Sequence, residues 1–325
     1  MSPDQSQVRL FDSHGDVREA SLDHQTGLGR DESQLLWIDL LSADRSHLDQ
    51  AAQAVGISPE ALDDLLSDDQ EDGWLDDQGG MVAAHAYTLE RTGDGYDREP
   101  LDIAAGPNWV ITSHGQAAAT IDDFAARLKT SRRVGDLDGA SFLAFLLDWL
   151  FTRYMGEIEA LDREIDELDL EILRSDADDD LLTSIANLRR RVAAIRRALA
   201  SHRELVTWPS HTEFSEAMTD RAQQHFTAVA ERFSQAMASI DTTRDSLNGC
   251  FDLLMSRVAQ RTNSTMRVLT VVSVSLLPAT LLTGILGMNF HPSFFDHPSY
   301  FWVVLAAIST IVLGALAAAR KYRWI

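Results

Sequence analysis

The sequence is short of cysteine and of basic residues. Its single cysteine, Cys250, in a chain of 325 residues excludes a disulfide scaffold and any zinc cluster built from several cysteines. Lys and Arg number 28 against 50 Asp and Glu, so the formal net charge is −22. Proteins that bind DNA or RNA use basic residues to neutralise phosphates. We therefore expect no nucleic acid among the partners of this chain.

Motifs of enzyme chemistry are also missing. The sequence contains no GxxxxGK[ST], HExxH or GxSxG pattern, so no phosphate-cradling loop or activated nucleophile is indicated. We expect no enzyme activity, no catalytic residue and no bound cofactor. The first residues, MSPDQSQVRLFD, lack an apolar segment, and no signal peptide is expected there.

Charge is nearly absent from the C-terminal part, where Asp296 is the only charged residue between Val268 and Ala319. The uncharged stretches Val268–Leu286 and Tyr300–Ala319 are close to the ~20 residues that a helix needs to cross a bilayer. The alternative, a pair of buried core helices, is not favoured for two such stretches joined by a short link. We predict two transmembrane helices in a hairpin.

Basic residues predict the orientation of this hairpin. They flank both spans, and the link at 288–299 has none; the six are Arg257, Arg261, Arg267, Arg320, Lys321 and Arg323. By the positive-inside rule both flanks are cytoplasmic. We predict a multi-pass protein of the cytoplasmic (inner) membrane with both termini in the cytoplasm. The whole-chain charge includes −1 from Asp296 and +3 from the last six residues, so residues 1–267 carry −24.

The N-terminal part, residues 1–135, is predicted to be a cytosolic α+β domain with a mixed sheet. Residues 1–30 are polar, and we expect them to lack regular structure. Patterns of apolar residues and turn signals predict strands at Leu35–Leu40, Met81–Leu89 and Leu101–Thr112, a Gly/Asp turn at Gly93–Gly95, and helices at Asp44–Ala54, Ser58–Ser67 and Ala117–Lys129.

Beyond this domain the pattern is helical. Apolar residues at alternating spacings of three and four predict an antiparallel helical hairpin over 140–208. Its first arm is acidic and its second is rich in arginine, which favours pairing between the arms over a nucleic-acid patch. Residues 215–267 are predicted to form a very long cytosolic stalk helix that continues into the first span. At ~1.5 Å per residue, this helix reaches on the order of 100 Å.

One face of the first span carries small, hydroxyl and amide side chains. We call this face the stripe; it consists of Asn263, Met266, Thr270, Ser273, Leu277, Thr280, Gly284 and Gly287, and its register extends down to Asp252. Such a face is either a helix-packing surface or the lining of a pore. Two spans cannot enclose a pore, so a pore would need several copies around one axis.

The segment Met266–Phe290 resembles the CorA family of divalent-metal channels. The resemblance rests on the mid-span Pro278, the tripeptide Gly287-Met288-Asn289 after the span, and the basic-aromatic ending RKYRWI. It implies a funnel-shaped homopentamer in which residues 268–287 line the pore, 288–299 form an extracytoplasmic loop, 300–319 form a short outer helix, and 320–325 form a basic cytosolic tail.

The resemblance also implies roles for single residues. The tripeptide would stand at the outer mouth, where Asn289 presents an amide oxygen from each copy. Thr280 and Gly284 would add oxygen rings below it. Leu277 and Met266 would be apolar constrictions, and Asn263 and Asp252 would line the cytosolic vestibule. The transported ion would be Mg²⁺, with Co²⁺ or Ni²⁺ also plausible.

Two departures leave alternatives open. The loop after the tripeptide holds a single carboxylate, Asp296, with His291 and His297, which fits a ZntB-like zinc transporter, with or without coupling to protons. At the stalk position where magnesium-gated members carry a regulatory acid, this chain has Ala228, so metal sensing is weaker or lies elsewhere, as at Asp252. A non-conducting membrane-tethered scaffold or sensor is the remaining alternative.

The charge of the N-terminal part generates a first prediction. Several copies that each carry −24 over residues 1–267 repel one another, and divalent cations offset close like charges. We expect millimolar Mg²⁺ to slow proteolysis of this part and to raise its melting temperature relative to a chelator. Identical cleavage and melting under both conditions would contradict this expectation.

Overall fold

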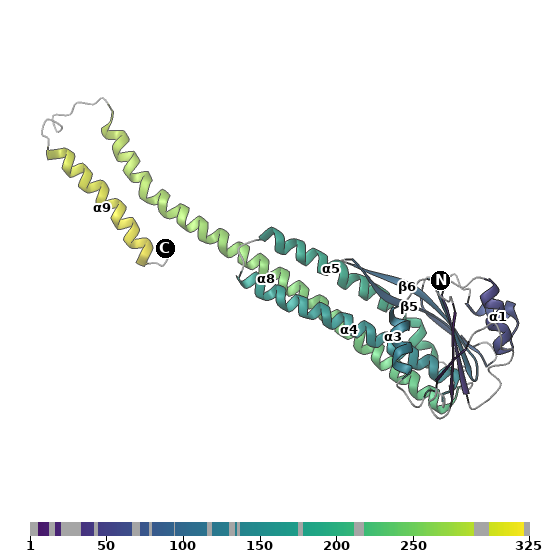
Figure 1. Cartoon of the computed structure of the whole chain (residues 1–325). Coiled ribbons are helices and arrows are strands. Elements are labelled where there is room, and N and C mark those ends of the chain that lie inside the picture. Colours follow the sequence, from purple (N-terminus) through teal and green to yellow (C-terminus); the bar gives the residue numbers. More distant parts are fainter. Residues whose placement is uncertain are drawn as a thin grey trace. The chain divides into compact units, whose positions relative to one another are not determined.

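The computed structural model describes residues 6–12, 17–20, 34–41, 45–66, 72–77, 80–93, 95–115, 119–129, 134, 137–174, 178–210, 218–288 and 299–321. The chain divides into two compact units, Met1–Cys250 and Phe251–Ile325. Each is described by itself below, and Figure 1 gives the course of the chain.

The first unit contains a seven-stranded mixed sheet with the order β2-β1-β3-β7-β6-β5-β4. In this sheet only β3 and β7 run parallel, and the other neighbours are antiparallel. This confirms the predicted α+β class. The strands are β1 (Ser6–Asp12), β2 (Val17–Ala20), β3 (Gln34–Leu41), β4 (Trp74–Asp77), β5 (Val82–Thr92), β6 (Gly95–Ala105) and β7 (Trp109–His114).

Two expectations about this sheet were wrong. Residues 1–30 do contain regular structure, since β1 pairs with β3 and buries Val8 and Phe11. Arg9, also on β1, is buried with its guanidinium over the Trp37 ring, so a polar residue here does not indicate a loop. The predicted strand Leu101–Thr112 is in fact the end of β6, a turn and the start of β7. Pro107 has no N–H to donate and ends the ladder there.

Strand β3 is buried on both faces, which makes the domain three-layered. Leu36, Ile38 and Leu40 belong to a core with α1 (Arg45–Val55) and α2 (Pro59–Leu66). From the other face, Trp37 contacts Phe124 of α3 (Ala119–Leu128) and Phe142 of α4 (Gly139–Arg174). Figure 1 shows α1 on one side of the strands and α3 and α4 on the other.

Helices α4 and α5 (Asp178–Ala200) form the predicted hairpin, followed by α6 (Arg203–Thr207) and the 3₁₀ turn η3 (Trp208–Ser210). The charge pairing between its arms is realised by Arg191, which binds Glu164. Other arginines of α5 face the stalk instead. Arg196 lies 2.8 Å from Asp241 of α8 (Asp220–Leu286), and the seam itself is apolar.

Helix α8 is continuous over 67 residues, as predicted, although positions 215–217 of the expected stalk lie outside the described residues. The carboxylate of Asp138 links the N-terminus of α8 to the N-terminus of α4. Asp138 accepts a hydrogen bond from the backbone N–H of Ser141 at 2.6 Å and from the Thr219 hydroxyl at 2.7 Å. The Thr219 hydroxyl in turn accepts the N–H of Ala222. Both helix N-termini are thereby capped in one network.

Cys250 of α8 is buried, and its thiol lies near the Ile165 carbonyl of α4. Burial, reinforced by the Asp169 carboxylate, raises the pKa of the Cys250 thiol to about 12. The thiol is therefore protonated at neutral pH and has little nucleophilic character. The only cysteine of the chain acts as a small core residue.

Helix α4 starts so close to the β6–β7 turn that only glycine fits at its first position. A Cβ at Gly139 would lie 2.0 Å from the Gly106 carbonyl oxygen and 2.8 Å from that of Trp109. A Cβ at Gly156, on the exposed side of the same helix, would meet no atom within 4 Å.

These two glycines generate a matched pair of variants. We expect Gly139→Ala to destabilise the first unit by about 2 kcal/mol or more, because backbone atoms must move. Gly156→Ala should stabilise it by about 0.5–1 kcal/mol, since alanine is the better helix former. Thermal or denaturant unfolding of the detergent-solubilised chain measures both. Equal midpoints for the two variants would refute the close approach at Gly139.

Candidate functional site

In the part of the chain that the structure describes, two helices are long and apolar enough to cross a membrane, namely α8 and α9 (Ser299–Lys321). Of the apolar stretch, 17% is buried in α8 and none in α9. Large side chains such as Leu277 and Trp302 are 68% and 67% exposed. A soluble core helix would bury these groups, so the alternative of two core helices is not supported.

The stripe lies on a face of α8 that its own chain leaves uncovered. Of the eight stripe residues, seven are exposed and Ser273 is half-buried. The buried residues in this part of α8 are Val271 and Ser275. At 3.6 residues per turn, these two lie on nearly the opposite side of the helix from the stripe. The stripe is therefore not a surface for packing within the chain.

The hydroxyl groups of the stripe donate their protons back to the helix. Thr270 donates to the Met266 carbonyl at 2.7 Å, and Thr280 donates to the Leu276 carbonyl at 2.9 Å. Each hydroxyl oxygen thus retains lone pairs that point away from its own donor bond. An exposed row of such oxygens can accept hydrogen bonds from the water shell of a cation.

Pro278 sits inside the apolar part of α8. Because proline has no N–H, the Val274 carbonyl four residues earlier lacks its usual helical partner. Near the helix end, the Gly287 N–H binds the Thr283 carbonyl at 2.9 Å, and the Met288 N–H binds the Ile285 carbonyl at 3.3 Å. These bonds close the last turn at the position of the tripeptide.

The structure places only part of the predicted site. Thr280 and Gly284 lie near the C-terminal end of α8, Gly287 and Met288 follow directly after it, and all four are exposed. The remaining predicted residues of the mouth and loop, Asn289, His291, Asp296 and His297, lie outside the described residues.

At the other end of the stripe, Asn263 and Asp252 are exposed on α8, and Met266 is 56% exposed. Within the described ranges, no group of three or more His, Cys, Asp or Glu side chains is arranged to hold a metal ion. One copy therefore offers oxygen atoms spaced along a helix rather than a closed coordination shell. Sequence reasoning missed the buried face at Val271 and Ser275, although their four-residue spacing signals it.

Fold and site together define a two-span membrane protein in which a mixed three-layer domain and a long helix precede the spans. The family model described as CorA-like Mg²⁺ transporter protein matches residues 32–321, and the chain belongs to this family. This confirms the resemblance carried by the first span and its tripeptide.

Individual relatives agree with this assignment. The chain is 24% identical over 302 residues to a Thermotoga maritima protein named cobalt/magnesium transport protein CorA, covering 91% of this chain and 85% of the relative. The structure of the CorA magnesium transporter from Methanocaldococcus jannaschii has a TM-score of 0.81 at 20% identity, with full coverage of both chains. The full-length CmaX structure has a TM-score of 0.73 at 19% identity and 99% coverage of both.

Two glycines in the spans test whether the stripe faces other copies. A Cβ at Gly284 on the stripe, or at Gly314 on α9, would meet no atom of its own chain within 4 Å. Neither Gly284→Ala nor Gly314→Ala should impair folding of the chain. We expect Gly284→Ala to reduce metal-ion flux about tenfold or more, because a ring of added methyl groups narrows a pore.

Gly314→Ala serves as the control and should retain the wild-type flux. Flux into liposomes is measured for both variants after size-exclusion chromatography has shown unchanged assembly. Equal flux through the two variants would mean that the stripe does not line the path of the ion.

Proposed function

We propose that the protein carries divalent cations across the cytoplasmic membrane through an axial pore formed by five copies, each contributing its α8. The observation that carries this proposal is the stripe, which is polar, lies on an apolar span and is not covered by its own chain. Lipid cannot satisfy such a face, whereas water and copies of the same helix can. Family membership and the names of the relatives support ion transport.

Magnesium is the proposed ion, with cobalt or nickel as further substrates. Mg²⁺ gives up its waters reluctantly and prefers oxygen ligands. Rings of neutral oxygens from Asn289, Thr280 and Gly284 could hold the hydrated ion without removing its water shell. Met266 and Leu277 would close the pore by excluding water between these rings and the vestibule at Asn263 and Asp252. Relatives named cobalt/magnesium transport proteins agree with this choice.

The alternative is a zinc carrier, with or without coupling to protons, in which His291 and His297 contact the ion. A flux assay in liposomes that compares Mg²⁺, Co²⁺, Ni²⁺ and Zn²⁺, with and without a pH gradient, separates the two. A channel conducts Mg²⁺ regardless of the pH gradient, and a proton-coupled carrier does not. A non-conducting scaffold would give no flux of any ion.

We further propose that the sheet domain and both termini lie in the cytoplasm. Arg257, Arg261 and Arg267 on α8 and the basic end of α9 support this orientation through the positive-inside rule. Ala228 is exposed on the stalk and offers no ligand. Regulation by cytosolic metal through that position is therefore not part of the proposal.

Asn289 is the position whose substitution tests the pore most directly. Asn289→Ala removes the amide oxygen from every copy at once, so we expect flux to fall at least about tenfold while the oligomer still assembles. If Asn289 serves only to end the helix, glycine should replace it well. Because we propose that the amide oxygen itself contacts the hydrated ion, we expect Asn289→Gly to lose flux as Asn289→Ala does.

Assembly is checked by mass measurement in detergent, where we expect five chains of 36.1 kDa. Near-normal flux in a correctly assembled Asn289→Gly oligomer would place the ion-selecting ring elsewhere. A stable monomer that still conducts would refute the pore formed by several copies.

A further inference from the structure

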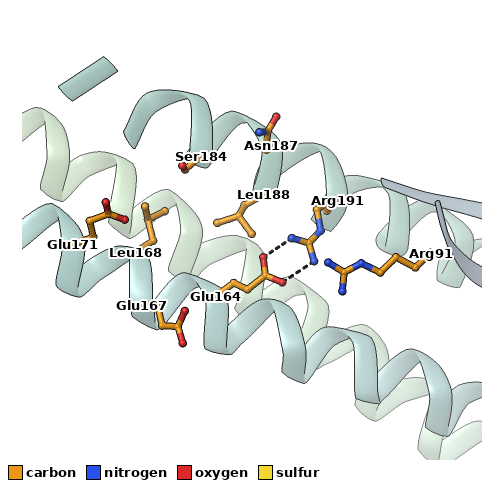
Figure 2. A pocket seen from close by; sticks show the side chains of 9 residues that line it. All are labelled: Arg91, Glu164, Glu167, Leu168, Glu171, Ser184, Asn187, Leu188 and Arg191. Atoms are coloured by element: carbon orange, nitrogen blue, oxygen red, sulfur yellow. Dashed lines mark hydrogen bonds and ion pairs between the residues drawn. The ribbon is translucent and has the colours of Figure 1, made fainter. Parts of the chain in front are cut away.

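A cavity of about 340 Å³ lies along one side of the hairpin in the first unit. Its floor is formed by Leu168 of α4 and Leu188 of α5, which belong to the buried seam. Carboxylates of α4 form one wall, polar residues of α5 form the other, and Arg91 at the end of β5 closes one end (Figure 2). The volume is at the small end of the range for ligand sites in proteins, ~300–1,000 Å³.

The closed end of the cavity is held in a fixed arrangement by Arg191. Its guanidinium binds both carboxylate oxygens of Glu164 and is 3.4 Å from the Tyr96 hydroxyl, which donates to Glu157 at 2.7 Å. The Arg191 hydrogen bond is the main cause that lowers the pKa of Glu164, and the Glu164 bond likewise raises the pKa of Arg191. The pair stays ionised at neutral pH, and its charges cancel.

The other charged side chains of the cavity lie apart by sign, with Arg91 at one end and Glu167 and Glu171 along α4. Figure 2 shows Arg91 reaching toward the Arg191–Glu164 pair. The Arg91 side chain forms no hydrogen bond or ion pair within the described part of the chain, and neither do those of Glu167 and Glu171. The charge of Arg91 contributes to lowering the Glu164 pKa, but Arg91, Arg191 and Glu164 together keep a net charge of +1. Glu167 and Glu171 add two negative charges on α4. Glu171 is about 10 Å further along the helix axis than Glu164.

The wall on α5 adds polar groups. The Asn187 side-chain oxygen accepts a bond from Arg190, which leaves its amide N–H groups as donors. The Ser184 hydroxyl donates to the Asp180 carbonyl at 3.1 Å, which leaves its oxygen as an acceptor. Donors and acceptors are thus both available along the cavity.

This charge pattern disfavours a ligand of one sign. A bare anion at Arg91 would face Glu167 and Glu171, and a bare cation at these two carboxylates would find too few ligands and a nearby guanidinium. Mg²⁺ is commonly held by one or two carboxylates together with phosphate oxygens, which satisfies both ends of the cavity. Arginine is well suited to binding phosphate.

We propose that this cavity binds a diphosphate group together with its divalent cation, with the phosphate on Arg91 and Asn187 and the metal on Glu167 and Glu171. Among the described residues that line the cavity, none has an aromatic ring on which a base could stack, so recognition rests on the phosphates. The ligand is inorganic diphosphate or the diphosphate end of a nucleotide. Such a site goes beyond transport, because it would detect chelated cation rather than the conducted ion.

The test is calorimetric titration of the full-length protein in detergent. Four probes are compared, namely Mg²⁺ alone, diphosphate with a chelator, Mg²⁺–diphosphate and Mg²⁺–ADP. The test variants are Arg91→Gln and the double variant Glu167→Gln/Glu171→Gln. Their charge-matched controls are Arg197→Gln and the double variant Glu159→Gln/Asp166→Asn, which change exposed residues of the same hairpin that do not line the cavity.

We expect Mg²⁺–diphosphate to bind and both test variants to weaken it by about tenfold or more, with less than about twofold change in the controls. If Mg²⁺–ADP binds with the same affinity as Mg²⁺–diphosphate, the site recognises the diphosphate that both share. If Mg²⁺–ADP binds more tightly than Mg²⁺–diphosphate, the site recognises nucleotides. Unchanged melting temperatures without ligand show that the variants fold.

Three results would overturn the proposal. They are diphosphate binding that does not require the metal, test variants that bind as tightly as the controls, and no binding of either chelate at millimolar concentration. The last result would indicate that a neighbouring copy covers this face. Because binding is measured without flux, it can succeed or fail independently of the proposed transport.

Discussion

A polar face on a helix that crosses lipid has to be covered by something other than lipid. In this chain the face is the stripe of α8, and the chain does not cover it: the buried positions Val271 and Ser275 lie nearly opposite. The hydroxyl protons of Thr270 and Thr280 are used within the helix, so what remains exposed are oxygen acceptors. This constraint is the basis of the proposal that copies of the chain assemble around water and cations.

A helix of 67 residues also needs lateral support, because an isolated helix gains little from its own hydrogen bonds. The first unit supplies that support over the N-terminal part of α8. Arg232 of α8 binds Asp148 of α4, and Arg196 of α5 binds Asp241 of α8. Partly exposed ion pairs of this kind add little stability individually. They do select which face of α8 meets the hairpin, while Phe233 and Leu247 add apolar burial.

Long periodic elements were predictable from the sequence because their signal is repeated many times. The hairpin seam and the continuous α8 follow from apolar spacing, and Ser58 caps α2 as the Ser-Pro-Glu start indicates, with its hydroxyl 3.1 Å from the Ala61 nitrogen. The strands β1 and β2 were not predictable in this way. They are short, and β1 depends on pairing with β3 and on the Arg9–Trp37 contact, which form only in the folded sheet.

The same difference in predictability separates the stripe from the cavity on the hairpin. The stripe was predictable because one helix carries all its residues at a regular spacing. The cavity on the hairpin was not, because it combines Arg91 of β5 with two helices whose register only the fold determines. The spacing of Glu164, Glu167 and Glu171 along one face of α4 was a visible signal, but it does not distinguish a solvated acidic face from the wall of a cavity.

The order of strands in the sheet bears on how the chain acquires its structure. The central pair β3 and β7 joins residues far apart in sequence, such as Asp39 and Thr112, so the sheet closes late and slowly compared with local helices. All seven strands nevertheless end by His114, long before the first span begins. During synthesis, the sheet can therefore close before either apolar helix leaves the ribosome. The hydrophobic residues of the two spans then do not compete with the core of the sheet for partners.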